Sequence, residues 1–305
     1  RPHSDMDALP PFIARLLPFR SHFVPVRFGP GVSRVHFLDH GEGRPVLLLH
    51  GNPTWSFLWR KVMSALEGGG LRMVAPDLIG LGLSDKPRRL SEHTLGNHGQ
   101  ALLELVERLD LRDVVLVAQD WGGPMGAWMA ARSGGRVTGL VLLNTSVLTP
   151  RAFKTTAFHR FSHLPAVSDV AFRLLNFPVP VLGRTQGDAR SISGDVARAY
   201  AWPLRHVVDR AAPLALARMV PNREGHPTVA ELAEGDAWVR GFEGPAELVW
   251  GLRDPILGRA LKRHREALPH ARVTETQAGH FLQEEVPEDI AAAIRRVAGV
   301  APEGA

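Results

Sequence analysis

An aspartate stands in the middle of a segment typical of a nucleophile-bearing turn. The apolar run Val114–Gln119 leads into Ala118-Gln119-Asp120-Trp121-Gly122-Gly123 and then into a helical pattern. Small residues around a central nucleophile allow the tight strand-to-helix turn that lifts a reactive side chain above a sheet. Asp120 would then lie at a helix N-terminus, where the helix dipole favours an anion. Aspartate also caps helices, so this segment alone fits a catalytic carboxylate and a helix cap equally.

Two further segments favour the catalytic interpretation. His50-Gly51-Asn52-Pro53 ends a buried apolar run, the position that supplies a backbone N–H to an oxyanion hole in folds with such a turn; an ordinary Gly-Pro turn is the alternative. Ala278-Gly279-His280-Phe281 lies between the last predicted strand and the C-terminal helix. A single histidine is more often structural, but the chain order nucleophile, acid, histidine makes His280 the candidate base.

The acid of this set is the hardest member to place. Asp254 follows the predicted strand Ala246–Gly251, and its alternative role is that of a turn-forming Asp-Pro. The other possible location, after the predicted strand Val137–Asn144, holds Asn144-Thr145-Ser146 and no carboxylate before Asp169. We therefore interpret Asp254 as the acid.

The elements that must position these residues follow an alternating pattern. Short β-branched runs alternate with helical patterns, which predicts a parallel sheet whose strands are buried on both faces and flanked by helices. The predicted strands are Pro45–His50, Met73–Asp77, Val114–Gln119, Val137–Asn144, Ala246–Gly251 and Val273–Gln277, preceded by an antiparallel hairpin of Phe23–Phe28 and Ser33–Leu38. The predicted helices are Ser56–Leu66, Leu95–Leu109, Gly122–Arg132 and Pro287–Val297.

This rhythm stops between Ser146 and about Trp238, where prolines recur and the apolar residues have a helical period. We therefore predict an α/β core of residues 1–146 and 239–305 with an inserted helical cap of residues 147–238. A cap over the carboxyl ends of parallel strands covers the crevice where ligands bind. His159 and His163 are spaced i, i+4 within it, and we interpret them as a surface face because no carboxylate accompanies them to form a metal site.

Composition excludes several classes of protein. The net charge of +5 comes from scattered arginines without interleaved aromatic residues, so we expect no nucleic-acid partner. No apolar stretch approaches the roughly 20 residues that cross a bilayer. The absence of cysteine excludes disulfides and thiolate catalysis and fits a cytoplasmic protein. We expect no metal or other cofactor, and the oligomeric state is not predicted.

The N-terminus, Arg1-Pro2-His3-Ser4, lacks the basic-then-apolar pattern of a signal peptide. Because it does not begin with Met, a removed targeting segment would not be visible in it.

Taken together, the motifs resemble those of the haloalkane dehalogenase family, which has the α/β-hydrolase fold. The resemblance rests on four segments and is strong across the predicted sheet but weak in the cap. They are His50-Gly51-Asn52-Pro53-Thr54, Asp77-Leu78-Ile79-Gly80-Leu81-Gly82-Leu83-Ser84-Asp85, Gln119-Asp120-Trp121-Gly122-Gly123 and Ala278-Gly279-His280. In that family the asparagine of the first segment and the tryptophan after the nucleophile hold the leaving halide. The resemblance therefore assigns halide binding to Asn52 and Trp121.

An aspartate suits this chemistry, because attack on a saturated carbon that bears a halogen needs a nucleophile already ionised near neutral pH. The alkyl ester on Asp120 would be opened by water, with His280 as general base and Asp254 holding the imidazole. The expected partners are a small halogenated organic substrate, water and the halide ion.

Other families share parts of this layout. Epoxide hydrolases use two cap tyrosines, whereas this chain has a single tyrosine, Tyr200. Fluoroacetate dehalogenases would carry an arginine where Trp121 stands. Coelenterazine-type luciferase monooxygenases share the same catalytic residues, and non-catalytic binding proteins of this fold often keep the triad, so both remain alternatives on the sequence alone.

Overall fold

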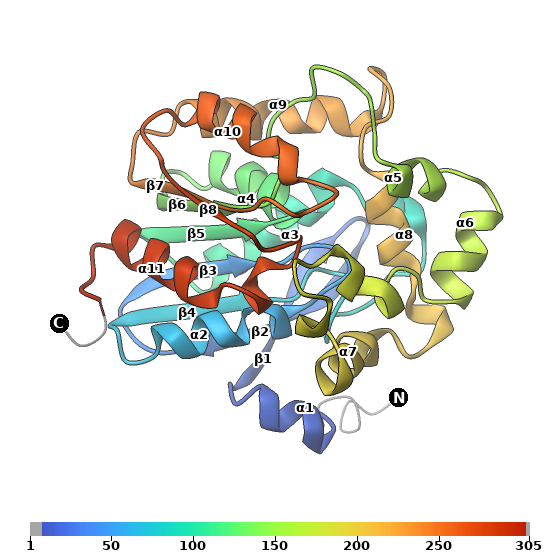
Figure 1. Cartoon of the computed structure of the whole chain (residues 1–305), viewed down its shortest axis with the longest axis horizontal. Helices are drawn as coiled ribbons and strands as arrows, with labels where there is room; N and C mark the ends of the chain where they lie inside the picture. The colour runs from blue at the N-terminus through green and yellow to red at the C-terminus, as the bar shows by residue number, and fades with distance from the viewer. Residues whose placement is uncertain (1–7, 303–305) are drawn as a thin grey trace.

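A single mixed sheet organises the chain. The computed structural model describes residues 8–302, and its eight strands lie in the order β1-β2-β4-β3-β5-β6-β7-β8 (Figure 1). Strand β2 pairs antiparallel with β1 and β4, and all other neighbours are parallel. The strands are β1 (Ser21–Phe28), β2 (Gly31–His40), β3 (Arg44–Leu49), β4 (Leu71–Pro76), β5 (Val114–Gln119), β6 (Val137–Leu143), β7 (Ala246–Gly251) and β8 (Arg272–Thr276).

Alternating side chains of the central strands enter two separate cores. Along β5, Val115 and Val117 join one buried cluster and Leu116 joins the other, because successive residues of a strand point to opposite faces. The prediction that every parallel strand is buried on both faces is wrong for β8, where Arg272 and Glu275 are exposed. Strand β8 is the edge of the sheet, so its outer residues have no neighbouring strand.

Helices cover both faces of the sheet, as predicted. Helices α2 and α11 contact each other on one face, and α3 packs against α4 on the other (Figure 1). The four predicted helices correspond to η2 (Ser56–Trp59) with α2 (Arg60–Leu66), α3 (Leu95–Arg108), α4 (Gly122–Ala131) and α11 (Pro287–Ala298). The short helices α1 (Pro11–Leu16) and α10 (Leu261–Ala267) were not predicted. In residues 8–302 no helix is both long and apolar enough to cross a membrane.

The segment between β6 and β7 contains helices and turns but, within the described residues, no strand. Its short helices α5, α6 and α8 lie together at one end of the sheet, while α9 packs against α3 and α4 (Figure 1). The range predicted for the cap therefore includes one helix that lies on the core layer. The elements are α5 (Ala157–Ser162), α6 (Val167–Asp169), η4 (Val170–Leu174), η5 (Val179–Thr185), η6 (Ala189–Ser191), α7 (Gly194–Ala201), η7 (Trp202–Leu204), η8 (Val207–Asp209), α8 (Ala211–Arg218) and α9 (Pro227–Arg240).

A buried ion pair ties this inserted segment to the core. The Arg60 guanidinium donates two hydrogen bonds to the Glu284 carboxylate, at 2.6 and 2.8 Å, and the hydroxyl of Tyr200 donates a third at 2.5 Å. Arg60 begins α2, Tyr200 lies on α7, and Glu284 ends the short helix η10 (Leu282–Glu284). Three elements distant in sequence are thereby joined next to the loop that carries His280.

Replacing Glu284 with alanine should therefore destabilise the protein strongly, because the Arg60 guanidinium would stay buried without its carboxylate. We expect the free energy of unfolding to fall by about 3–5 kcal/mol, measured by urea denaturation. The control is Glu107→Ala, which removes an exposed carboxylate of α3 and should change stability by less than about 0.5 kcal/mol. Equal losses in the two variants would show that the buried pair contributes nothing specific.

Candidate active site

The backbone around Asp120 forms the sharp turn that the sequence predicts. Asp120 follows β5 directly, has φ of 53°, and precedes helix α4. A Cβ atom on Gly122 would collide with the carbonyl oxygen of Leu49, and one on Gly123 would collide with the Thr145 side chain. The two glycines are therefore required for the turn to approach the neighbouring strands closely.

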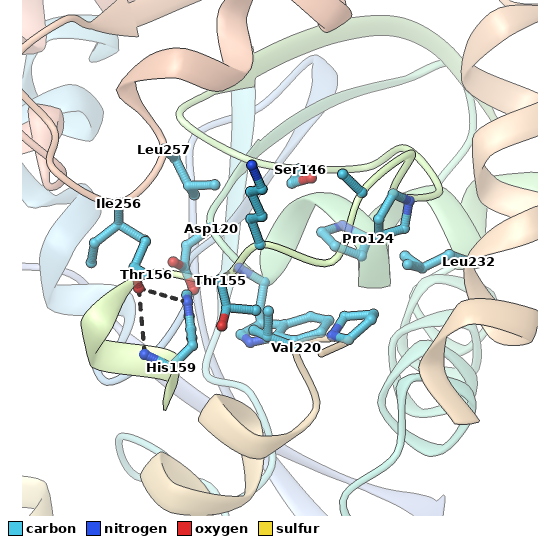
Figure 2. A pocket seen from close by; sticks show the side chains of 15 residues that line it. Asp120, Pro124, Ser146, Thr155, Thr156, His159, Val220, Leu232, Ile256 and Leu257 are labelled. Carbon is cyan, nitrogen blue, oxygen red and sulfur yellow. Dashed lines mark hydrogen bonds between the residues drawn. The ribbon is translucent and has the colours of Figure 1, made fainter. Parts of the chain in front are cut away.

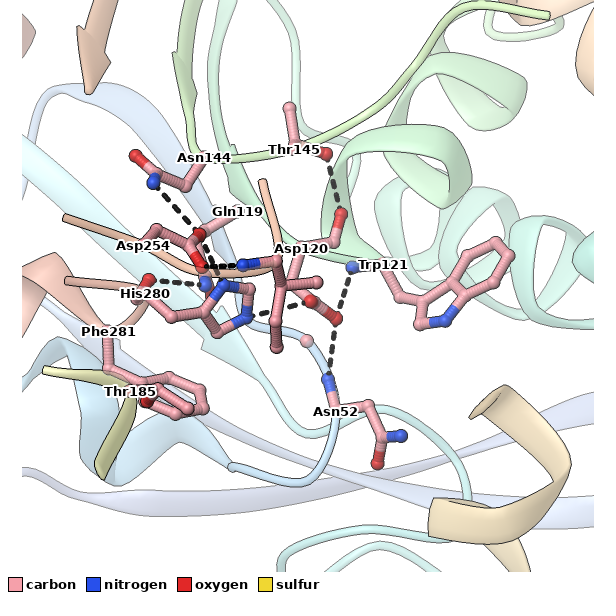
Figure 3. Close-up of polar contacts among 12 residues, drawn as sticks. Asn52, Gln119, Asp120, Trp121, Asn144, Thr145, Thr185, Asp254, His280 and Phe281 are labelled. Carbon is pink, nitrogen blue, oxygen red and sulfur yellow. Dashed lines mark hydrogen bonds and ion pairs between the residues drawn. The ribbon is translucent and has the colours of Figure 1, made fainter. Parts of the chain in front are cut away.

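Both oxygens of the Asp120 carboxylate accept hydrogen bonds. Oδ2 accepts the backbone N–H of Asn52 at 3.0 Å and that of Trp121 at 2.7 Å, and Oδ1 lies 2.9 Å from Nε2 of His280 (Figure 3). Burial raises the pKa of Asp120, but the His280 contact and the two N–H groups outweigh it and hold the pKa below its ordinary value. The carboxylate is thus ionised, and one of its oxygens accepts two backbone N–H groups.

The imidazole of His280 lies between two carboxylates. Its Nδ1 is 2.6 Å from Oδ2 of Asp254, on the side opposite to Asp120. Burial lowers the pKa of His280, but the two negative charges more than offset this and raise the pKa to about 10. The ring is therefore an imidazolium at neutral pH, with one N–H donated to each carboxylate. The structure brings together all three residues that the sequence predicts as the catalytic set.

Two further polar side chains hold this set in place, and neither role was predicted from the sequence. The amide of Asn144 donates to Oδ2 of Asp254 at 3.0 Å and accepts the Gly251 N–H at 2.7 Å. The amide of Gln119 donates to the carbonyl of His280 at 3.0 Å. Asn144 follows β6 and Gln119 ends β5, so a polar residue at the carboxyl end of a buried strand was the available signal.

The side chains predicted to hold a halide lie beside Asp120 but point elsewhere. Nδ2 of Asn52 donates to the carbonyl of Pro213 at 3.0 Å, and Nε1 of Trp121 donates to the carbonyl of Leu216 at 3.0 Å. Both acceptors belong to helix α8, and Figure 3 shows the two side chains directed away from the Asp120 carboxylate. Their N–H groups are therefore engaged by backbone carbonyls.

Two cavities meet at Asp120. The larger, of about 320 Å³, also touches Asn52 and His280, and aromatic side chains such as Phe177 contribute to its wall. The smaller, of about 210 Å³, contains Asp120 but neither of those two residues (Figure 2). A crevice at the carboxyl ends of the strands, beneath the inserted helices, is where the sequence predicted it.

The residues that line these cavities bear on two predictions from the sequence, those for His159 and Tyr200. His159, which we expected on a surface face, is half-buried and touches both cavities, because α5 packs against α8 beside the site. Tyr200 is fully buried against Glu284 and touches neither cavity. The only tyrosine of the chain is thus not available to activate an epoxide oxygen.

Comparison with known proteins gives consistent relatives. Residues 44–167 match the family described as alpha/beta hydrolase fold. A haloalkane dehalogenase of Mycobacterium marinum is 36% identical over 287 residues, which cover 90% of this chain and 92% of that protein. A haloalkane dehalogenase 2 of Mycobacterium bovis is 34% identical and covers 92% of this chain and 95% of its own length.

Solved structures agree. A mutant haloalkane dehalogenase from Agrobacterium tumefaciens C58 has a TM-score of 0.79 at 30% identity, covering 90% of this chain and 96% of that chain. A haloalkane dehalogenase from Bradyrhizobium elkanii has a TM-score of 0.80 at 26% identity, covering 92% and 98%.

The charge arrangement at Asp120 leads to a titration experiment. Asp120→Asn removes one of the two charges that raise the pKa of His280, so we expect that pKa to fall below about 10 while Asp254 still favours the imidazolium. The measurement is NMR titration of ¹⁵N-labelled histidines, with mass spectrometry confirming that the new amide is intact. His264, whose pKa burial lowers to about 4, should titrate unchanged, and an unaltered His280 would contradict the charge coupling.

Proposed function

The chain belongs to the haloalkane dehalogenase family, and from this premise we propose that Asp120 is the nucleophile, His280 the base and Asp254 the acid of its reaction. The enzyme hydrolyses haloalkanes to an alcohol and a halide ion. One observation carries the residue assignment: the Asp120 carboxylate has one oxygen at a pair of backbone N–H groups and the other at the imidazole of His280.

In the first step Oδ1 of Asp120 attacks the carbon that bears the halogen. A bond forms between that oxygen and the carbon, the carbon–halogen bond breaks, and the halide leaves with the electron pair. No base is needed, because the pKa of Asp120 is below its ordinary value and the group is already ionised.

Forming the ester removes the negative charge of Asp120, and with it part of the interaction that raises the pKa of His280. The imidazolium then loses a proton more readily, so alkylation itself converts His280 into a base. Asp254 remains 2.6 Å from Nδ1 and keeps Nε2 oriented to the ester. The charge of the nucleophile thus controls when the base becomes active.

In the second step water attacks the carboxyl carbon of Asp120 and gives a proton to Nε2 of His280. Negative charge develops on Oδ2, the oxygen that the N–H groups of Asn52 and Trp121 already contact. The bond between the alkyl oxygen and the carboxyl carbon then breaks, and the departing alcohol takes the proton from the imidazolium. The carboxyl group that remains passes its own proton to Nε2 of His280, which restores the ion pair of Asp120 and the imidazolium. Together with the proton that His280 released to water after alkylation, the net products are alcohol, halide and one proton.

For the departing halide we propose the side-chain N–H groups of Asn52 and Trp121. Both line the larger cavity beside the nucleophile. To reach a halide they must leave or share the carbonyls of helix α8, so the position of α8 sets how available these donors are.

A cytoplasmic location is also our proposal, supported by a composition without cysteine.

The two-step scheme predicts a trapped intermediate. His280→Phe should leave alkylation intact and block hydrolysis, so treatment with 1,2-dibromoethane should add one bromoethyl group to the peptide that contains Asp120. Mass spectrometry of the digested protein measures this, and the double variant Asp120→Ala/His280→Phe serves as the unlabelled control. A His280→Phe protein that stays unmodified at Asp120 after prolonged exposure would reject the covalent route.

The nucleophile assignment has a separate test. Asp120→Ala should reduce halide release by at least about 10³-fold with chlorinated, brominated and iodinated alkanes, while Asp289→Ala, an exposed carboxylate of α11, should leave it unchanged. Halide in the medium is measured with and without purified enzyme. Retained turnover in the Asp120 variant would mean that another group attacks the substrate.

A further inference from the structure

The smaller cavity is not needed by the chemistry proposed above. It touches Asp120 and Trp121 but neither His280 nor Asn52, and both of those lie on the larger cavity. Its volume is about 210 Å³, whereas about 150 Å³ of apolar cavity holds a benzene molecule. A substrate whose reacting carbon lies at Asp120 can therefore extend several atoms into this space.

Polar side chains gather on one wall of the smaller cavity. Lys154, Thr155, Thr156 and His159 come from the segment that enters helix α5, and Ser146 lies opposite, after β6. Figure 2 shows Thr156 and His159 beside Asp120. The aromatic wall contributed by Phe158 and Phe177 belongs instead to the larger cavity. Thr156 and His159 also touch the larger cavity, so they lie where the two cavities meet.

Hydrogen bonding favours one tautomer of His159. Oγ1 of Thr156 accepts the backbone N–H of His159 at 3.4 Å, as the N-cap of α5, and lies 2.9 Å from Nδ1 of the same residue (Figure 2). A hydroxyl can accept twice but also has one proton to donate, and among the described residues Nδ1 is the acceptor within reach of that proton. We therefore assign the imidazole proton to Nε2, because this tautomer gives the Thr156 hydroxyl proton a partner.

This N–H is neutral and has no acceptor in the protein among the described residues. Burial lowers the pKa of His159 to about 4, although the Asp120 charge acts in the opposite direction. No hydrogen bond involves Nε2 of His159 in residues 8–302, whereas the side-chain N–H groups of Asn52 and Trp121 donate to carbonyls of α8. His159 thus presents a free donor to a space that also contains the nucleophile.

We infer that the smaller cavity is a subsite for a hydrogen-bond acceptor at the far end of the substrate, and that Nε2–H of His159 is its donor. This rests on the proposed function, since it requires the reacting carbon at Asp120. A plain alkyl chain in the subsite would leave the N–H desolvated and unpaired, which costs binding free energy. The favoured substrates are haloalkanes that carry a nitrile, carbonyl or ether group a few bonds from the halogen.

Two substrates of matched length test the subsite. In 4-bromobutyronitrile a nitrile nitrogen replaces the terminal methyl group of 1-bromopentane. We expect the wild-type enzyme to favour the nitrile by about tenfold in kcat/KM, measured by bromide release. His159→Phe keeps a ring of similar size without a donor and should abolish this preference, while His159→Gln retains an N–H group and should restore part of it.

The control variant is His163→Phe, directly after helix α5 but touching neither cavity, which should keep the wild-type preference. A wild-type enzyme that releases bromide from both substrates equally, or a His159→Phe enzyme that loses the same factor on both, would overturn the subsite. If no bromide is released from either substrate by the wild-type enzyme, the proposed function fails instead. Bromide release from 1-bromopentane by the wild-type enzyme therefore separates failure of the proposed function from failure of the subsite.

Discussion

The site depends on one constraint, the confinement of an imidazolium between two carboxylates in a buried position. His280 and Asp254 are almost completely inaccessible to solvent, and charges in such surroundings persist only when they are paired and hydrogen-bonded. Asp120, His280 and Asp254 together carry one net negative charge. The backbone N–H groups of Asn52 and Trp121, which donate to Oδ2 of Asp120, help to balance it. The sharp turn at Asp120 contributes to this, since its Oδ2 accepts the N–H of the next residue, Trp121, as well as that of Asn52.

The same constraint explains why the loop of His280, the base that we propose, is held by hydrogen bonds from the inserted segment as well as from the sheet. The backbone N–H of His280 donates to the carbonyl of Thr185 at 3.0 Å, and the Phe281 N–H donates to the Gln186 side chain at 2.9 Å. The Glu285 carboxylate accepts N–H groups from Gly187 in that segment and from the loop before His280. The loop that carries His280 therefore has little freedom to move away from Asp120. A change in the inserted segment would be transmitted to His280.

Much of this arrangement could be predicted from the sequence, because it depends on local signals. The strands and the turn at Asp120 follow from apolar runs and small residues, and the order of Asp120, Asp254 and His280 follows from strand ends. The direction of the Asn52 side chain could not be predicted, since it depends on where α8 lies. The position of His159 beside the cavities could not be predicted either. A helix as short as α5 has no sequence pattern that indicates which of its faces packs inward.

Helix α8 determines how strongly the halide site that we propose can bind. The side-chain N–H groups of Asn52 and Trp121 already donate to carbonyls of α8 at 3.0 Å. A halide bound there would therefore gain only the difference in free energy between two hydrogen-bonded states. Exchange of this kind contributes far less than a hydrogen bond to a free donor. The negative charge on the halogen grows as the carbon–halogen bond breaks, while Asp120 loses its own charge to the new ester bond, and it is complete once the halide has left. In our proposal, donors that can return to α8 afterwards favour release of the product ion, whereas the Nε2–H of His159 would contact the part of the substrate that does not become charged.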